Sequence, residues 1–225
     1  MSLKLAKLHM KKNVIFHTDA AQAVGHIPMD VEKMNIDLMS FSAHKMYGPK
    51  GIGALYVRGV NPRVKPDPII HGGGQERNIR SGTLNVPAIV GFGKAIELAN
   101  REMNSENDRF KMWVKLMIDE FFKIGGKLNG HPVKRLPYNL NVCFRGIDGK
   151  AIINSVSSKI AISAGSACTT QAVEPSHVLL ALGLSEEDTH SSIRIGIGRF
   201  NTKEEIEFAI ETISLSVKHL LKIKI

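Results

Sequence analysis

The chain has 225 residues, 43% hydrophobic and 23% charged, which is the composition of a globular protein with enough apolar residues for one large or two small cores. No apolar run approaches the roughly 20 residues that a membrane-spanning helix needs, and the first residues lack the apolar core of a secretory signal, so we expect no membrane association. The formal net charge of +9 is spread along the chain without a basic block, which argues against direct nucleic-acid binding and leaves either a surface for an acidic protein partner or a solvated surface.

The first elements predict an alternation of strands and helices. Residues 13–17 form a β-branched and aromatic strand, residues 31–35 a short helix and residues 36–41 a second, mostly buried strand. This alternation is typical of a mostly parallel sheet, in which ligands bind beyond the carboxyl ends of the strands. Asp19 and Gln22 fall at that place. Asp19 is either an N-cap or an anion that pairs with a protonated ring nitrogen.

The stretch after the second strand carries the strongest chemical signal. Ser42, His44 and Lys45 follow the strand directly, and the turn residues Gly48-Pro49 and Gly51 then stop regular structure. A hydroxyl and an imidazole can hold a phosphate, and a partly buried lysine has a lowered pKa and a nucleophilic amine that can form a Schiff base. A surface lysine after a strand is the alternative, and these residues alone leave both open.

A glycine-rich loop follows the next strand, which spans residues 52–57. From His71 to Thr83 the loop has glycines, arginines and hydroxyl groups, a composition suited to a phosphate or carboxylate. It lacks the spacing of a Walker loop or a dinucleotide fingerprint, so alone it is a weak signal.

Pro87 opens a long helical region that ends near Gly125-Gly126, as two helices or one bent helix. A composition shift after Leu98 predicts a domain boundary, with one domain over residues 1–98 and a smaller one over residues 99–225. The second domain is predicted to contain strands over 139–144, 160–163 and 193–197, helices over 149–157 and 176–182, and a final amphipathic helix that begins with a capping box of Thr202 and Glu205.

The two cysteines cannot build a disulfide framework and fit a reducing compartment. Cys143 lies within a predicted strand and is most simply a buried apolar residue. Cys168 lies in the small-residue loop 163–172, which favours an exposed nucleophile. Arg194 interrupts an apolar strand and needs a partner, either a substrate carboxylate or a structural salt bridge.

Taken together and in order, these motifs resemble those of cysteine desulfurases. The motifs are Asp19-x-x-Gln22, Ser42-x-His44-Lys45, the loop 72–83, Ser166-Ala167-Cys168 and His190-Ser191-Ser192-Ile193-Arg194. The resemblance implies an α/β, aminotransferase-like fold of pyridoxal-phosphate-dependent transferases. Residues 1–98 would be the C-terminal part of the large, mostly parallel-sheet domain, and residues 99–225 a small α+β domain that carries the cysteine loop.

The resemblance also implies a cofactor, pyridoxal 5'-phosphate, bound covalently to Lys45. Asp19 would pair with its ring nitrogen and Gln22 with its phenolic oxygen, while Ser42 and His44 would hold its phosphate. No metal is implied.

Further roles follow from the resemblance. Thr83 would reach the phosphate of the neighbouring subunit in a homodimer, and Arg194 would bind the carboxylate of the substrate, L-cysteine. Cys168 would take the sulfur as a persulfide, leaving L-alanine. An iron–sulfur scaffold or another acceptor protein would receive that sulfur, for iron–sulfur clusters or tRNA thiolation. The expected location is the cytoplasm, or an organelle matrix if the source is eukaryotic.

The N-terminal half of the family pattern has no match in the chain, so we expect activity to depend on that half. Two alternatives stay open. One is an enzyme similar to selenocysteine lyase, and the other is a non-catalytic protein that binds a desulfurase or a sulfur acceptor.

Overall fold

The computed structural model describes residues 14–164 and 174–223, and the chain forms two compact units, Met1–Asn104 and Ser105–Ile225. The long helix α2 (Val86–Phe122) begins in the first unit and ends in the second. It is one continuous helix in the sequence region where two helices or one bent helix were predicted. In the described part of the chain, no helix combines the length and the apolar character that crossing a bilayer requires.

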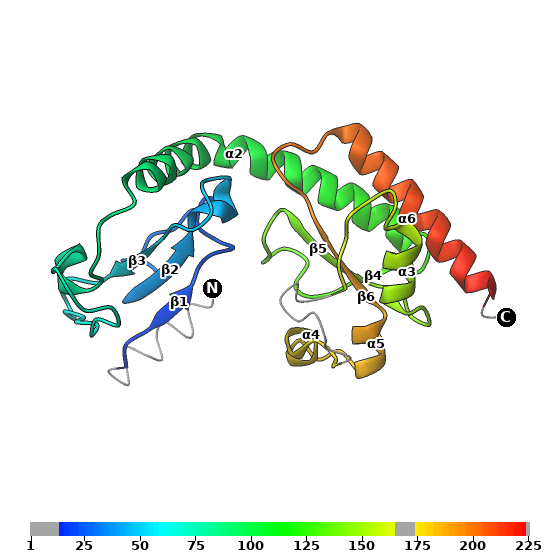
Figure 1. Cartoon of the computed structure of the whole chain (residues 1–225). Helices are drawn as coiled ribbons and strands as arrows, with labels where there is room; N and C mark the ends of the chain where they lie inside the picture. The colour runs from blue at the N-terminus through cyan, green and yellow to red at the C-terminus, as the bar shows by residue number, and fades with distance from the viewer. Residues whose placement is uncertain (1–13, 165–173, 224–225) are drawn as a thin grey trace. The chain divides into compact units, whose positions relative to one another are not determined.

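The first unit is built on a three-stranded sheet in the order β1-β2-β3 (Figure 1). Its strands are β1 (His17–Asp19), β2 (Leu38–Ser42) and β3 (Gly53–Val57). β1 runs parallel to β2, with Asp19 opposite Ser40, and β3 runs antiparallel to β2. The carboxyl ends of β1 and β2 therefore lie at the same edge of the sheet, while β3 ends at the opposite edge.

Two local predictions in this unit are wrong. The described residues 14–16 of the first predicted strand are not strand, and β1 begins at His17. The backbone N–H of Phe16 binds the Asp37 carboxylate (2.9 Å), and only its carbonyl joins β2, by accepting the N–H of Leu38 (3.1 Å). The helix predicted over residues 31–35 is only a turn. Asn35 has a φ of +49°, in the left-handed region, so a right-handed helix cannot continue through it.

Two short 3-10 helices complete the first unit, η1 (Ala43–Met46) after β2 and η2 (Glu76–Asn78) in the glycine-rich loop. Ala43 and Met46 are buried against Phe92, Ala95 and Ala99 of α2. This small cluster ties η1 to the first turns of α2.

The second unit is an antiparallel sheet covered by helices, with the strand order β4-β5-β6. Its elements are β4 (Lys127–Leu128), β5 (Asn139–Cys143), α3 (Gly149–Val156), α4 (His177–Ala181), α5 (Glu186–His190), β6 (Ser192–Gly196) and α6 (Lys203–Ile223). α3 packs against β6 and α6. The C-terminal part of α2 adds Phe110, Trp113, Met117 and Phe121 to the core of this unit.

The sequence-based predictions hold better here. Thr202 and Glu205 form the predicted capping box, with N–H to side-chain oxygen distances of 3.1 and 3.3 Å. The strand predicted over residues 160–163 is wrong, because only Ser163 pairs, as an isolated bridge to Arg194. The short elements β4 and α5 were not predicted.

A buried ion pair joins all three strands of the first unit at the end where β2 starts. Arg58, which follows β3 and is 5% exposed, donates from Nε to the carboxylate of Asp37 (3.0 Å), just before β2. The same guanidinium binds Glu32 (2.7 Å) and the carbonyl of Ile36 (2.9 Å). Since the other Asp37 oxygen accepts the N–H of Phe16, before β1, the pair fixes the start of β1 and of β2 and the end of β3.

We expect Arg58→Leu to lower the free energy of unfolding by about 3–5 kcal/mol, because it leaves the Asp37 carboxylate buried without its cation. Urea unfolding followed by circular dichroism measures this change. The matched control is Lys115→Ala, which removes an exposed ion pair with Asp119 and should cost less than about 1 kcal/mol. Equal losses in the two variants would contradict the role assigned to Arg58.

Candidate functional site

The carboxyl ends of β1 and β2 bring predicted site residues from two parts of the sequence to one edge of the sheet. Asp19 is the last residue of β1, and Ser42 the last residue of β2, directly before η1. The backbone N–H of Ala20 donates to the carbonyl of Ser40 (2.8 Å), which fixes the end of β1 beside β2. The structure thus places Asp19 at the same sheet edge as Ser42, His44 and Lys45.

Asp19 is exposed and has a local structural role as well. Its Oδ1 accepts the backbone N–H of Ala21 (2.9 Å), which closes the turn after β1. Its Oδ2 has no hydrogen-bond partner among the described residues. The turn-capping alternative is therefore present, and it leaves one carboxylate oxygen for a ligand. Gln22 is exposed in the same turn.

η1 anchors its small and apolar residues and exposes its polar ones. Ala43 and Met46 are buried, whereas His44 and Lys45 are exposed, and neither polar side chain has a hydrogen bond or ion pair within the described ranges. The backbone is held by a 3.0 Å bond from Gly48 N–H to the Ala43 carbonyl. It is also held by the imidazole of His26, whose Nε2 lies 2.8 Å from the Lys45 carbonyl oxygen. His26 was not among the site residues predicted from the sequence.

These groups define what the edge can bind. A carboxylate suits a protonated ring nitrogen, a primary amine can bond covalently to an aldehyde, and an imidazole with a hydroxyl suits a phosphate. A ligand that combines an aldehyde, a basic ring nitrogen and a phosphate fits this set. Where the structure is described, no group of three His, Cys, Asp or Glu side chains could hold a metal ion.

The glycine-rich loop is ordered by its own hydrogen bonds and lies elsewhere. Gly74 N–H donates to the buried Ser81 hydroxyl (3.4 Å), and Gly82 N–H to the side chain of Gln75 (2.9 Å). The chain leaves β3 at the edge opposite η1, and Figure 1 draws the loop, in cyan and green-blue, beyond that end. Thr83 is exposed in this segment, and the described contacts do not join it to the Asp19 edge.

The other two predicted residues belong to the second unit. Arg194 lies in β6, opposite Asn141 of β5, and its backbone pairs with Ser163. Arg194 is partly buried and has no ion pair among the described residues, so the structural salt bridge that was the alternative is not found there. Cys168 lies outside the described residues.

Cys143 is the buried apolar residue that was predicted. It is 1% exposed in β5, beside the ion pair of Arg145 and Asp188, which is bidentate at 2.7 Å. Burial first, and the Asp188 carboxylate second, raise the pKa of the Cys143 thiol. The hydrogen bond from Arg145 lowers the pKa of Asp188, so the negative charge persists beside the thiol. Cys143 is therefore held as a thiol and is a poor nucleophile.

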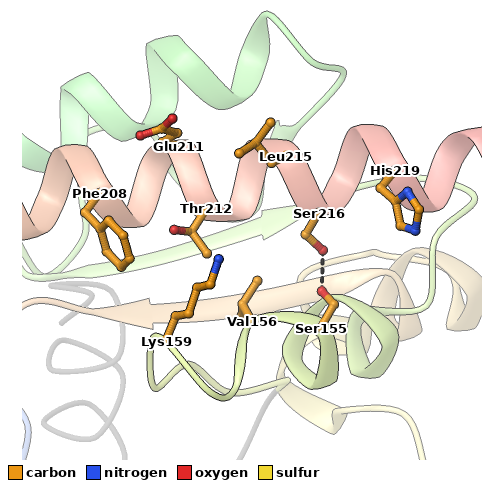
Figure 2. A pocket seen from close by; sticks show the side chains of 9 residues that line it. All are labelled: Ser155, Val156, Lys159, Phe208, Glu211, Thr212, Leu215, Ser216 and His219. Atoms are coloured by element: carbon orange, nitrogen blue, oxygen red, sulfur yellow. Dashed lines mark hydrogen bonds between the residues drawn. The ribbon is translucent and has the colours of Figure 1, made fainter.

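A groove of about 380 Å³ lies between α3 and α6 in the second unit. Figure 2 shows the exposed Phe208 and Leu215 on α6 and Lys159 after α3. The hydroxyl groups of Ser155 and Ser216 form a hydrogen bond with each other in the same groove. None of the predicted site residues lines this groove.

Comparison with known proteins gives consistent matches. The family model described as Aminotransferase class-V matches residues 3–208. The mitochondrial cysteine desulfurase of Arthroderma benhamiae is 49% identical over 218 residues, covering 96% of this chain and 43% of that protein. The cysteine desulfurase IscS of Pseudomonas entomophila is 48% identical over 221 residues, covering 96% of this chain and 53% of that protein.

Solved structures agree. A NifS-like protein superposes with a TM-score of 0.85 at 34% identity, covering 97% of this chain and 57% of that one. A NifS-like protein from Rickettsia africae gives a TM-score of 0.83 at 30% identity, covering 96% of this chain and 57% of that one. The chain spans about half the length of the curated relatives it matches.

We expect Cys143 to resist alkylation by iodoacetamide at pH 8 in the folded protein, and Cys168 to react. Peptide mapping by mass spectrometry separates the two, and urea should expose Cys143. Equal labelling rates in the folded protein would contradict this assignment.

A pH effect on stability follows from the raised pKa. Stability contributed by the protonated Cys143 is fully present below the pKa of the unfolded thiol, about 8.5, and is lost as the pH rises through the higher folded pKa. Urea unfolding between pH 7 and 10 should therefore show a steeper alkaline loss for the wild type than for Cys143→Ala. The same pH dependence of the free energy of unfolding in both proteins would contradict this prediction.

Proposed function

The chain belongs to the class-V aminotransferase family and has the fold of that family, and on this premise we propose that it serves a pyridoxal-phosphate-dependent cysteine desulfurase reaction. The observation that carries the proposal is that Asp19, at the end of β1, and Lys45, in η1 directly after β2, lie at the same edge of the sheet because the two strands are parallel. Curated relatives named cysteine desulfurase, identical at about half of the aligned positions, support the same reaction.

The residues of this edge take distinct roles toward the cofactor. When bound, pyridoxal phosphate supplies an electron sink for negative charge at the substrate. The amine of Lys45 would hold the cofactor covalently and would move a proton to or from the substrate. The free oxygen of Asp19 would pair with the ring nitrogen and keep it protonated, and Gln22 would donate to the phenolic oxygen. Ser42 and His44 would hold the phosphate.

The substrate proposed is L-cysteine, with Arg194 as the partner of its carboxylate through a planar, bidentate contact. Cys168 attacks the substrate sulfur as a thiolate. A sulfur–sulfur bond forms and the substrate carbon–sulfur bond breaks, with its electron pair staying on carbon. That carbon takes up a proton, so the products are L-alanine and a persulfide on Cys168.

The persulfide sulfur would then pass to an acceptor protein, such as an iron–sulfur scaffold or a carrier for tRNA thiolation. A homodimer fits the position of the glycine-rich loop, which lies beyond the end of β3 that is opposite η1 (Figure 1). Thr83 in this loop would then contact the phosphate of a neighbouring subunit. The bacterial and mitochondrial relatives are compatible with the cytoplasm or an organelle matrix.

The first test is covalent trapping. We expect stoichiometric pyridoxal phosphate followed by borohydride to label Lys45 above all other lysines, because the neighbouring carboxylate and phosphate-binding groups concentrate the cofactor there. Peptide mapping by mass spectrometry identifies the labelled residue, and Lys45→Ala should lose the label.

The matched control for trapping is Lys50→Ala, since Lys50 is an exposed lysine five residues further along the same segment. This variant should keep the label on Lys45. Labelling spread evenly over the lysines in the wild type would contradict the cofactor site.

The second test addresses the sulfur step. We expect protein loaded with pyridoxal phosphate, and supplied with the N-terminal half of the family pattern, to convert L-cysteine to alanine. Cys168→Ala should reduce alanine formation to background under the same conditions, because no thiolate then receives the sulfur. Chromatography of alanine measures the step, and Cys143→Ala is the control that should stay active. Undiminished alanine from Cys168→Ala would instead favour chemistry of the selenocysteine lyase kind.

A further inference from the structure

The backbone carbonyl of Lys45 has no nearby backbone N–H from which to accept a hydrogen bond. In a helical turn that carbonyl would accept from the N–H three or four residues later. Three residues on, the N–H of Gly48 already binds the Ala43 carbonyl (3.0 Å). Four residues on stands Pro49, which has no N–H. The local backbone therefore leaves the Lys45 carbonyl without a donor.

His26 supplies that donor from a distant part of the chain. Its side chain is 9% exposed, and its Nε2 lies 2.8 Å from the Lys45 carbonyl oxygen. A carbonyl oxygen can only accept a hydrogen bond, and a partly buried one left unpaired is costly, so this contact selects the His26 tautomer that carries the proton on Nε2. The imidazolium form also donates from Nε2, so the contact does not require a particular charge.

The turn that contains His26 packs closely against η1. Gly25 has a φ of +82°, and a Cβ there would come within 3.0 Å of the Met46 Cβ and 3.3 Å of the Ala99 Cβ. The turn begins immediately after Asp19 and is closed by bonds from Val24 N–H to the Ala20 carbonyl and from His26 N–H to the Ala23 carbonyl, both 3.0 Å. It therefore links the carboxylate end of the site to the lysine end.

We propose that His26 is a positioning residue for Lys45: its hydrogen bond to the Lys45 carbonyl fixes the backbone from which the reactive amine extends, relative to Asp19. This inference rests on the proposed function, since it concerns the lysine assigned to the cofactor. The Lys45 side chain has four methylene groups and no described partner, so a fixed backbone is what limits the space that its amine can reach.

The test compares His26→Leu with His26→Gln, because the Gln side-chain nitrogen can occupy the place of Nε2 and still donate. Two measurements are made on each variant: the fraction of Lys45 labelled by pyridoxal phosphate and borohydride, and hydrogen exchange of the peptide that spans residues 43–50. We expect His26→Leu to lower the labelled fraction of Lys45 by about fivefold and to speed hydrogen exchange in this peptide by a similar factor. His26→Gln should bring both measurements to within about twofold of the wild type.

Two controls separate positioning from general damage. His219→Leu changes an exposed histidine in the second unit and should match the wild type in both measurements. Exchange over β2, residues 38–42, should be unchanged in His26→Leu. Unchanged labelling and exchange at residues 43–50 in His26→Leu would overturn the proposal, and so would faster exchange throughout the first unit, which would indicate a merely structural role.

The exchange measurement does not depend on the cofactor. If the wild type fails to label Lys45 selectively, the proposed function fails. Faster exchange at residues 43–50 in His26→Leu, with the wild-type exchange rate regained in His26→Gln, would still support the contact between His26 and η1.

Discussion

The buried pair of Arg58 and Asp37 is the constraint on which the first unit depends. A three-stranded sheet with a three-residue strand at one edge has few ladder hydrogen bonds to define its register. The ion pair compensates by binding the N–H of Phe16, before β1, and the carbonyl of Ile36, before β2, while Arg58 itself directly follows β3. Because two buried charges are costly to separate, these strands keep one alignment.

This arrangement separates stability from chemistry along the sheet. The ion pair lies where β1 and β2 begin, and the groups proposed to bind the cofactor lie where the same two strands end. At the chemical end the side chains of Lys45 and His44 have no described protein partners, so their polar atoms are available to a ligand. The fixed register at one end thus decides which residues stand together at the other.

Much of this could be predicted from the sequence, because the signals are local. A buried strand followed by Ser-x-His-Lys and Gly-Pro predicted β2 and a loop after it, where the structure has the short 3-10 helix η1. A Thr-x-x-Glu pattern predicted the capping box of α6. The errors arose where distant contacts decide the structure. β1 starts late because Phe16 binds Asp37, 21 residues away, and the segment before Ser163 is not a strand because only one residue pairs with β6.

His26 shows a more instructive limit. Its own neighbourhood gives no sign of a role, since a lone histidine in a turn is chemically ambiguous. The sign lies at Lys45, where Gly48 and Pro49 leave the carbonyl without a backbone donor. Because a backbone carbonyl that is partly buried needs a hydrogen-bond donor, the sequence around Lys45 indicates that a donor must come from elsewhere in the chain, although only the fold identifies which one. Counting such unpaired backbone groups near a predicted site is therefore a way to search for positioning residues that motif matching misses.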